Sequence, residues 1–321
     1  MHSFQELSEI FSQKFNVRHF PTSPASLYEP NEYFLSVSGK RIRPALCLMG
    51  NELFGEIIPD AYEVATAIEL FHNFSLVHDD IMDKAPLRRG MPTLHEKYNF
   101  STALLAGDVM LVVAYDYINK IDTRYLSRIL RLFNQTAREV CEGQQLDMEY
   151  ETIENVDLAG YINMIALKTS VLIAGGLQMG AILGGAGEAN QQHLYEFGKN
   201  LGIAFQIQDD YLDAFGDPEK FGKQVGGDIL ANKKTFLLIK ALEVAATDEK
   251  KELKYLMKSD VPDKVARVLD IFRNAGVDTW ASSLKDQYIQ SAYKHLEDIA
   301  VLSSRKEPLK ALAQFLIKRD Y

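Results

Sequence analysis

The longest stretch without proline is the feature that most constrains the fold of this chain of 321 residues. No proline lies between Pro92 and Pro218, and this stretch carries apolar residues at three- and four-residue spacing, as in YLSRILRLFNQTAREV. Proline breaks helix interiors, and the spacing places apolar side chains on one helical face. Period-two runs rich in Val, Ile and Thr are hard to find anywhere. The pattern predicts an all-α fold.

Four glycine- or proline-containing breaks interrupt the helical pattern: PTSPASLYEPN, KAPLRRGMPTLH, GDPEKFGKQVGGD and SDVPD. None is long, low in complexity or uniformly charged enough to separate two cores. A chain of this length exceeds the usual size of one core, but long helical domains do reach it as one unit. We therefore predict a single domain over residues 1–321.

Composition limits the classes of function. Hydrophobic residues make up 47% of the chain and charged residues 25%, as in ordinary soluble globular proteins. The net charge of −9 argues against a nucleic-acid binder, because a phosphate backbone demands a basic face. Cys47 and Cys141 lack metal-type spacing, so neither a zinc site nor a disulfide framework is expected. A reducing, cytoplasmic location is the default expectation.

No segment predicts a membrane span. The N-terminal MHSFQELSEIFSQKF lacks the basic start and apolar run of a secretory signal, and predicts an amphipathic surface helix. The most membrane-like stretch, from Val171 to Gly187, is short, rich in glycine and interrupted by Gln178. It predicts a tightly packed internal helix.

Two acidic clusters, DDIMD at 79–83 and DDYLD at 209–213, each follow an apolar helical run and look like counterparts. Aspartates three or four positions apart project from one helical face and repel one another, so a cation should compensate them. Mg²⁺ prefers oxygen ligands and is often completed by substrate phosphates, which predicts two facing clusters that grip one diphosphate. For one cluster alone, solvated surface charge is an equal alternative. The residues concerned are Asp79, Asp80, Asp83, Asp209, Asp210 and Asp213.

Basic residues accompany both clusters and could bind phosphate. An arginine pair follows the first cluster, GKRIRP concentrates three cations beside Gly39, and a glycine-rich loop after the second cluster includes Lys223 and Lys233. Lys168 lies between two apolar segments, where a buried ammonium needs an anionic partner. Surface charge, a solvated loop or a structural ion pair are the alternatives. The cations are Lys40, Arg41, Arg43, Arg88, Arg89, Lys168, Lys223 and Lys233.

These motifs together resemble the trans-isoprenyl diphosphate synthases, also called polyprenyl synthetases. The resemblance runs from residue 39 to residue 235 and is carried, in the family order, by GKRIRP, ELFHNFSLVHDDIMD, RRG, LAGD, KTS, FQIQDDYLD, GDPEKFGK and NKK. It implies a helical bundle with a central active-site cavity. It also implies a homodimer, which the apolar helix from Val171 to Gly187 could help to form.

The resemblance further implies a reaction and the residues that perform it. Isopentenyl diphosphate is joined to an allylic diphosphate (dimethylallyl, geranyl or farnesyl), with three Mg²⁺ ions held by the six aspartates and Asp79, Asp83 and Asp209 foremost among the ligands. Lys40, Arg43, His72 and Arg89 match the isopentenyl diphosphate pocket. Arg88, Lys168, Lys223 and Lys233 match the groups that hold the allylic diphosphate, and Thr169 and Gln206 match positions that stabilise the allylic cation.

From the residues alone, His72 is more typical of a core histidine, and His78 is expected to be structural or to support the site. Phe74 and Phe71 precede Asp79 by five and eight positions, about 7 and 12 Å along a helix, so either ring could form the floor of a product tunnel. In the family, an aromatic residue at Phe74 implies short products. The small Ser75 favours geranylgeranyl over farnesyl diphosphate. Packing in the core is the alternative for both rings.

Two other functions share part of this pattern. A terpene cyclase would have the first aspartate cluster but needs no pocket for a second diphosphate, so GKRIRP and the second cluster argue against it. A catalytically inactive helical subunit should lack some of the metal-binding or basic residues, and here all are present.

Overall fold

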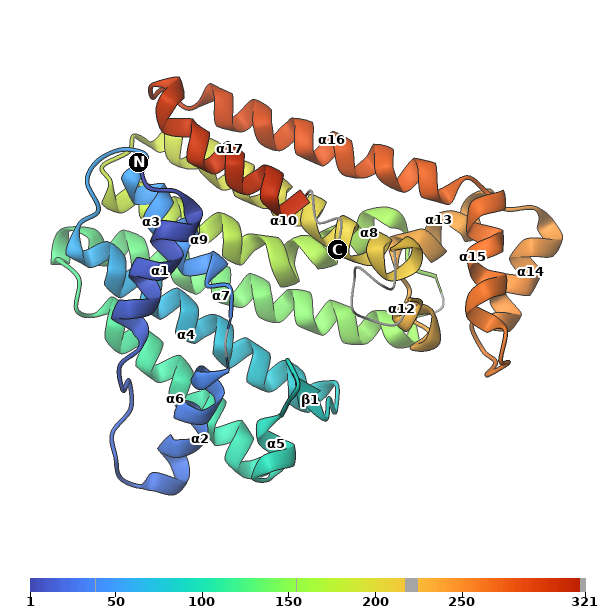
Figure 1. Cartoon of the computed structure of the whole chain (residues 1–321), viewed down its shortest axis with the longest axis horizontal. Helices are drawn as coiled ribbons and strands as arrows, with labels where there is room; N and C mark the ends of the chain where they lie inside the picture. The colour runs from blue at the N-terminus through green and yellow to red at the C-terminus, as the bar shows by residue number, and fades with distance from the viewer. Residues whose placement is uncertain (38, 154, 217–224, 318–321) are drawn as a thin grey trace. The chain divides into compact units, whose positions relative to one another are not determined.

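The computed structural model describes residues 1–37, 39–153, 155–216 and 225–317. Within these ranges the regular elements are helices, joined by turns and loops, and two short antiparallel strands, β1 (Leu87–Arg88) and β2 (Met91–Pro92), in which Leu87 pairs with Pro92 (Figure 1). The prediction of an all-α fold is confirmed.

The described residues group into two compact units. Unit 1 comprises Met1–Ala137, Gly175–Tyr195 and Ile299–Leu309, and unit 2 comprises Arg138–Ala174, Glu196–Asp298 and the residues from Lys310 onward. Four helices contribute residues to both units: α7 (Thr123–Thr152), α9 (Val171–Leu183), α10 (Glu188–Phe215) and α17 (Ser303–Ile317). The single domain predicted over residues 1–321 stays a prediction.

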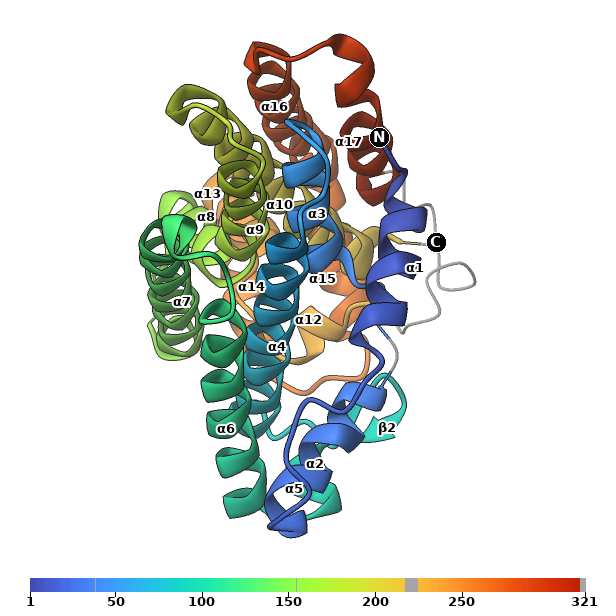
Figure 2. The ribbon, with the colours of Figure 1, turned by 90° about the vertical axis from the view of Figure 1, so that its left-hand side faces the viewer.

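Unit 1 also contains six helices of the N-terminal part: α1 (Phe4–Phe15), α2 (Ala25–Ser36), α3 (Ile42–Glu52), α4 (Pro59–Met82), α5 (Leu94–Lys97) and α6 (Phe100–Ile118). Helices α4 and α6 lie side by side in both views (Figure 1; Figure 2). Gly107 of α6 makes this approach possible, because a Cβ there would lie 2.3 Å from His78 Nε2 of α4. The His78 Nε2 lies 3.2 Å from the Leu104 carbonyl oxygen, so this histidine joins the two helices.

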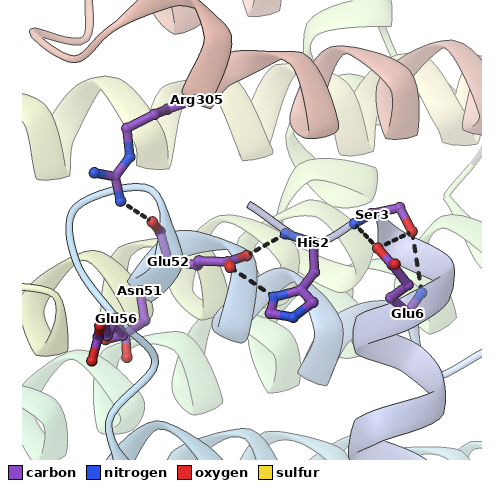
Figure 3. Close-up of polar contacts among 7 residues, drawn as sticks. All are labelled: His2, Ser3, Glu6, Asn51, Glu52, Glu56 and Arg305. Carbon is purple, nitrogen blue, oxygen red and sulfur yellow. Dashed lines mark hydrogen bonds and ion pairs between the residues drawn. The ribbon is translucent and has the colours of Figure 1, made fainter.

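The N-terminal segment forms the helix α1, as the sequence predicts, and this helix buries its apolar face. Ser3 and Glu6 form a capping box, in which each side chain meets the other residue's backbone N–H. His2 holds the segment to the end of α3: its backbone N donates to Glu52 Oε2 at 3.0 Å, and its Nδ1 lies 2.7 Å from Oε1 (Figure 3). Arg305 donates to the Glu52 carbonyl at 2.6 Å, which fixes α17 to the same point.

Helix α9 is internal, as predicted. Its glycines allow α3 to approach closely, because a Cβ at Gly180 would lie 2.0 Å from the Cys47 carbonyl oxygen. By length and composition, two segments could cross a membrane, Phe100–Ile118 and Leu158–Leu183, but 78% of the apolar window of the second is buried within the chain. That burial is typical of a core helix.

Unit 2 also contains further helices, which lie around an apolar core that includes Ile207, Phe236 and Phe272. They are α8 (Leu158–Ile165), the π-helix η1 (Ala166–Ser170), α12 (Gly227–Leu230), α13 (Phe236–Val244), α14 (Thr247–Leu256), α15 (Lys264–Asn274) and α16 (Val277–Asp298). Helices α14 and α15 pack side by side (Figure 1). Lys234 Nζ donates to three carbonyls at the end of α7, those of Tyr150, Glu151 and Ile153, which positions the segment before α13.

Candidate active site

The first aspartate cluster ends α4. Asp80 is 2% exposed and accepts hydrogen bonds from Arg88 Nε at 2.8 and 2.9 Å, and Arg88 Nη2 lies 2.7 Å from the same carboxylate. Burial raises the pKa of Asp80 and Arg88 opposes this shift, so the arginine is its counter-ion. Asp79 lies 3.6 Å from Arg88 Nη2, and Asp83 is exposed. An ion bound to Asp80 would therefore have to displace Arg88.

A second polar region of unit 1 gathers Arg43, His72 and Arg89, three of the four residues predicted to bind isopentenyl diphosphate; the fourth, Lys40, is exposed. Arg43 Nη1 lies 3.1 Å from His72 Nε2, and because a guanidinium only donates, that nitrogen accepts and the ring is neutral. Burial lowers the pKa of His72 well below its usual value, and the charges of Arg43, Arg89, Arg88 and Arg41 lower it further. This region is a concentration of positive charge around a neutral histidine.

The same region has an unused donor. Burial lowers the pKa of Arg43 to about 10, yet its buried Nε makes no hydrogen bond within the described part of the chain. An anionic ligand would satisfy this donor. Gly39 brings the GKRIRP segment against Arg89, since a Cβ there would lie 2.7 Å from Arg89 Nη1. Arg41 instead pairs with Glu69 and lies over the Phe15 ring, so its guanidinium is held by the fold and acts on His72 through its charge.

The second aspartate cluster lies near the end of α10 in unit 2. Asp210 is 3% exposed and accepts hydrogen bonds from the Tyr161 hydroxyl and, at 2.9 Å, from Gln206 Nε2. Burial raises the pKa of Asp210 to about 6, although Lys233 and both hydrogen bonds oppose the shift. Asp213 Oδ2 accepts from the backbone N of Asp228 at 3.0 Å, at the start of α12.

Lys168 and Thr169 lie on the π-helix η1, a widened turn often found at functional sites. Gly143 of α7 permits this arrangement, because a Cβ there would lie 2.2 Å from the Lys168 backbone N. Lys168 Nζ donates to Asp147 Oδ2 at 2.5 Å, which supplies the anionic partner that the sequence required. Thr169 Oγ1 donates to Gln206 Oε1 at 3.5 Å.

Sequence reasoning missed three residues of this site: Asp147, Asp228 and Tyr161. Burial alone would lower the pKa of Lys233, but Asp210, Asp228, Asp147 and Asp213 together outweigh it and raise that pKa. For Asp147, the one hint in the sequence was that Lys168 needed an anionic partner. For Asp228, it was the aspartate of the GGD segment. Nothing in the sequence pattern pointed to Tyr161. Lys223, also predicted to hold the allylic diphosphate, lies outside the described residues.

The residues predicted to set product length lie on α4. Phe71 is 1% exposed and packs against Phe74 and Phe133, with ring centroids 5.6 and 5.5 Å away. Phe74 keeps accessible surface, and its ring lies 4.7 Å from that of His78. Ser75 Oγ donates to the His72 carbonyl at 2.8 Å. Phe71 is thus a core residue, whereas Phe74 is the ring of the pair that a ligand could still contact.

The donor set fits a hard cation. Within the described residues no group of three or more His, Cys, Asp or Glu side chains is arranged to hold a metal ion, and Asp80 and Asp210 accept hydrogen bonds from protein donors. In unit 2, Asp147, Asp210, Asp213 and Asp228 act together on Lys233, and Asp147 also accepts from Lys168. Carboxylate oxygens are the ligands that Mg²⁺ prefers, and this ion keeps waters and is completed by phosphate oxygens.

Known proteins resemble the chain over its whole length. The polyprenyl synthetase family model matches residues 24–274. A short chain isoprenyl diphosphate synthase of Methanothermobacter thermautotrophicus is 35% identical over 322 residues, which is 100% of this chain and 99% of the relative.

Solved structures agree. A crystal structure of a geranylgeranyl pyrophosphate synthase is 42% identical, with a TM-score of 0.93 and 99% of each chain covered. The geranylgeranyl pyrophosphate synthase of Corynebacterium glutamicum, solved with isoprenyl diphosphate and magnesium, is 26% identical with a TM-score of 0.87, and covers 99% of this chain and 100% of its own. The family depends on magnesium. The chain therefore belongs to the polyprenyl synthetase family and is a prenyltransferase of the short-chain isoprenyl diphosphate synthase type.

Proposed function

We propose that this enzyme makes geranylgeranyl diphosphate by adding isopentenyl diphosphate to allylic diphosphates. The proposal rests on one observation: unit 1 contains two separate groups of charged residues, one basic and one acidic. Arg43, His72 and Arg89 form a positively charged region, while Asp79 and Asp83 belong to the acidic cluster at the end of α4 in the same unit. Two diphosphate sites of different chemistry suit a condensation of two diphosphates. A terpene cyclase has no use for the second.

The proposed reaction divides between these groups. Arg88 of unit 1, and Lys168 and Lys233 of unit 2 with Lys223, would hold the allylic diphosphate. Asp79 and Asp83 of unit 1 and Asp209 of unit 2 would hold three Mg²⁺ ions. When bound, the ions neutralise the charge that grows on the departing diphosphate. The allylic carbon–oxygen bond breaks and the isopentenyl double bond forms the new carbon–carbon bond. The released diphosphate takes the proton that is then lost.

The chain's own residues orient both partners. Arg43, Arg89, His72 and Lys40 hold isopentenyl diphosphate so that its double bond lies at reacting distance from the allylic carbon. Thr169 and Gln206 direct oxygen atoms toward the cation. We also propose a cytoplasmic location, because Cys47 and Cys141 are free thiols, which suits a reducing compartment.

Incubation of the purified protein with labelled isopentenyl diphosphate and each allylic starter tests the proposed reaction. We expect incorporation of label with dimethylallyl, geranyl and farnesyl diphosphate, a twenty-carbon product, and no turnover in excess EDTA. A cyclic hydrocarbon formed without consumption of isopentenyl diphosphate would instead show a cyclase. No reaction with any starter would indicate an inactive subunit.

Product length should depend on Phe74. Removing this ring in Phe74→Ala, alone or with Phe71→Ala, should extend the product by one or more five-carbon units, because it opens space along α4. Ser75→Phe should shorten the product. Leu76→Ala is the control, since this half-buried residue lies ~200° around the helix from Phe74. Product lengths are measured by chromatography. If the Phe74→Ala variant, the Phe74→Ala/Phe71→Ala variant and the Ser75→Phe variant all give the wild-type product distribution, these residues do not form the floor of the product tunnel.

We further propose a homodimer formed through α6. The expectation that the helix from Val171 to Gly187 helps to form it is wrong, because its apolar side chains are already buried within one chain. The outer face of α6 instead exposes apolar side chains: Phe100 is 58% exposed, Leu105 55% and Val112 60%. An apolar face of this kind on a helix is typical of an interface.

Light scattering on the double variant Leu105→Glu/Val112→Glu tests the proposed dimer. We expect the mass to fall from two chains to one, since two charges would be desolvated at the interface. Leu302→Glu is the control, because Leu302 is 74% exposed and lies outside this face. A double variant that keeps the wild-type mass would place the interface elsewhere, and a monomeric wild type would rule out the dimer.

A further inference from the structure

A chain of hydrogen bonds in unit 2 links Tyr161 on α8 to Thr169 on η1 through two side chains of α10. The Tyr161 hydroxyl donates to Asp210 Oδ2, and Gln206 Nε2 donates to Asp210 Oδ1 at 2.9 Å. Thr169 Oγ1 donates to Gln206 Oε1 at 3.5 Å. The chain therefore joins three helical segments, α8, α10 and η1, and its Asp210 is 3% exposed.

The Asp210 carboxylate fixes which end of the Gln206 amide faces it. A carboxylate only accepts hydrogen bonds, so the amide nitrogen must point to Asp210 and the carbonyl oxygen must point away from it. That oxygen then lies on the side of Thr169. Without the carboxylate, the amide could turn by a half-rotation and present its N–H groups instead.

Tyr161 holds the carboxylate in this position. It is 1% exposed, and its ring packs against Phe236 with centroids 6.1 Å apart, so the hydroxyl has little freedom to move. With one oxygen bound to Tyr161 and the other to Gln206, Asp210 differs from Asp209 and Asp213, which are partly exposed. The buried carboxylate is committed to protein donors.

We propose that Tyr161 and Asp210 are positioning residues that hold the Gln206 carbonyl oxygen toward the allylic carbon as it becomes positive, and that Asp210 serves this purpose in place of binding Mg²⁺. The proposal rests on the prenyl transfer described above. A fixed carbonyl dipole stabilises a cation in a water-poor site, whereas an N–H group in its place would destabilise it.

Two substitutions test the two positioning residues one at a time. Tyr161→Phe removes one donor and leaves the carboxylate with Gln206 alone. Asp210→Asn goes further, because the new amide can donate to Gln206 Oε1 and stabilise the inverted orientation. Tyr288→Phe is the control, since Tyr288 packs against the same core.

Binding measured by calorimetry tests the proposal without turnover. The probes are a prenyl ammonium, in which a positive nitrogen replaces the cationic carbon, added with Mg²⁺ and inorganic diphosphate, and an uncleavable allylic thiolodiphosphate, which carries no positive charge. We expect Asp210→Asn to weaken ammonium binding at least about tenfold and Tyr161→Phe by about threefold, as for lost electrostatic hydrogen bonds. Both variants should keep the wild-type affinity for the thiolodiphosphate and the wild-type Mg²⁺ requirement.

Two results would overturn the proposal. If Asp210→Asn raises the half-saturating Mg²⁺ concentration as Asp209→Asn should, Asp210 is a metal ligand. If ammonium binding is unchanged in both variants, the carbonyl is not positioned by them. Failure of the wild type to bind either probe would instead contradict the assigned reaction. Unchanged melting temperatures in the variants would exclude a general loss of structure.

Discussion

Repulsion between clustered carboxylates is the constraint on which the rest of this site depends. Each helix that carries an aspartate cluster places like charges on one face, where they raise the free energy of the fold unless something compensates them. Within the described residues, Arg88 neutralises Asp80, and Lys168 and Lys233 offset carboxylates of unit 2. The divalent cation and diphosphate of the proposed function would add further compensation.

The region proposed to hold isopentenyl diphosphate has the opposite arrangement. Around His72 the excess charge is positive, and the histidine stays neutral because burial and its arginine neighbours both disfavour a proton on the ring. One buried Arg43 donor makes no hydrogen bond within the described residues, so this region could accept an anion without a metal. In the proposed function, the enzyme would sort two chemically similar diphosphates by placing metal-binding carboxylates beside one and fixed cations beside the other.

Much of this could be predicted from sequence because it is local. Proline-free apolar periodicity predicted the helices, and spacing within DDIMD and DDYLD placed the aspartates on helical faces. The partners could not be predicted, because Tyr161 with Asp210 and Asp147 with Lys168 join segments 49 and 21 residues apart. For the same reason, spacing alone did not distinguish the six aspartates, although the family resemblance put Asp79, Asp83 and Asp209 foremost; in the structure, Asp80 and Asp210 are the two of the six that are buried.

The affinity of an uncleavable allylic thiolodiphosphate, measured across a range of Mg²⁺ concentrations, tests the central claim most directly. If bridging cations join the leaving diphosphate to the aspartates, the wild type should bind this compound at least about a hundredfold more tightly in saturating Mg²⁺ than in EDTA. Asp79→Asn and Asp209→Asn should each remove most of that gain. Equal affinity in EDTA and Mg²⁺, or an undiminished gain in both variants, would contradict the account.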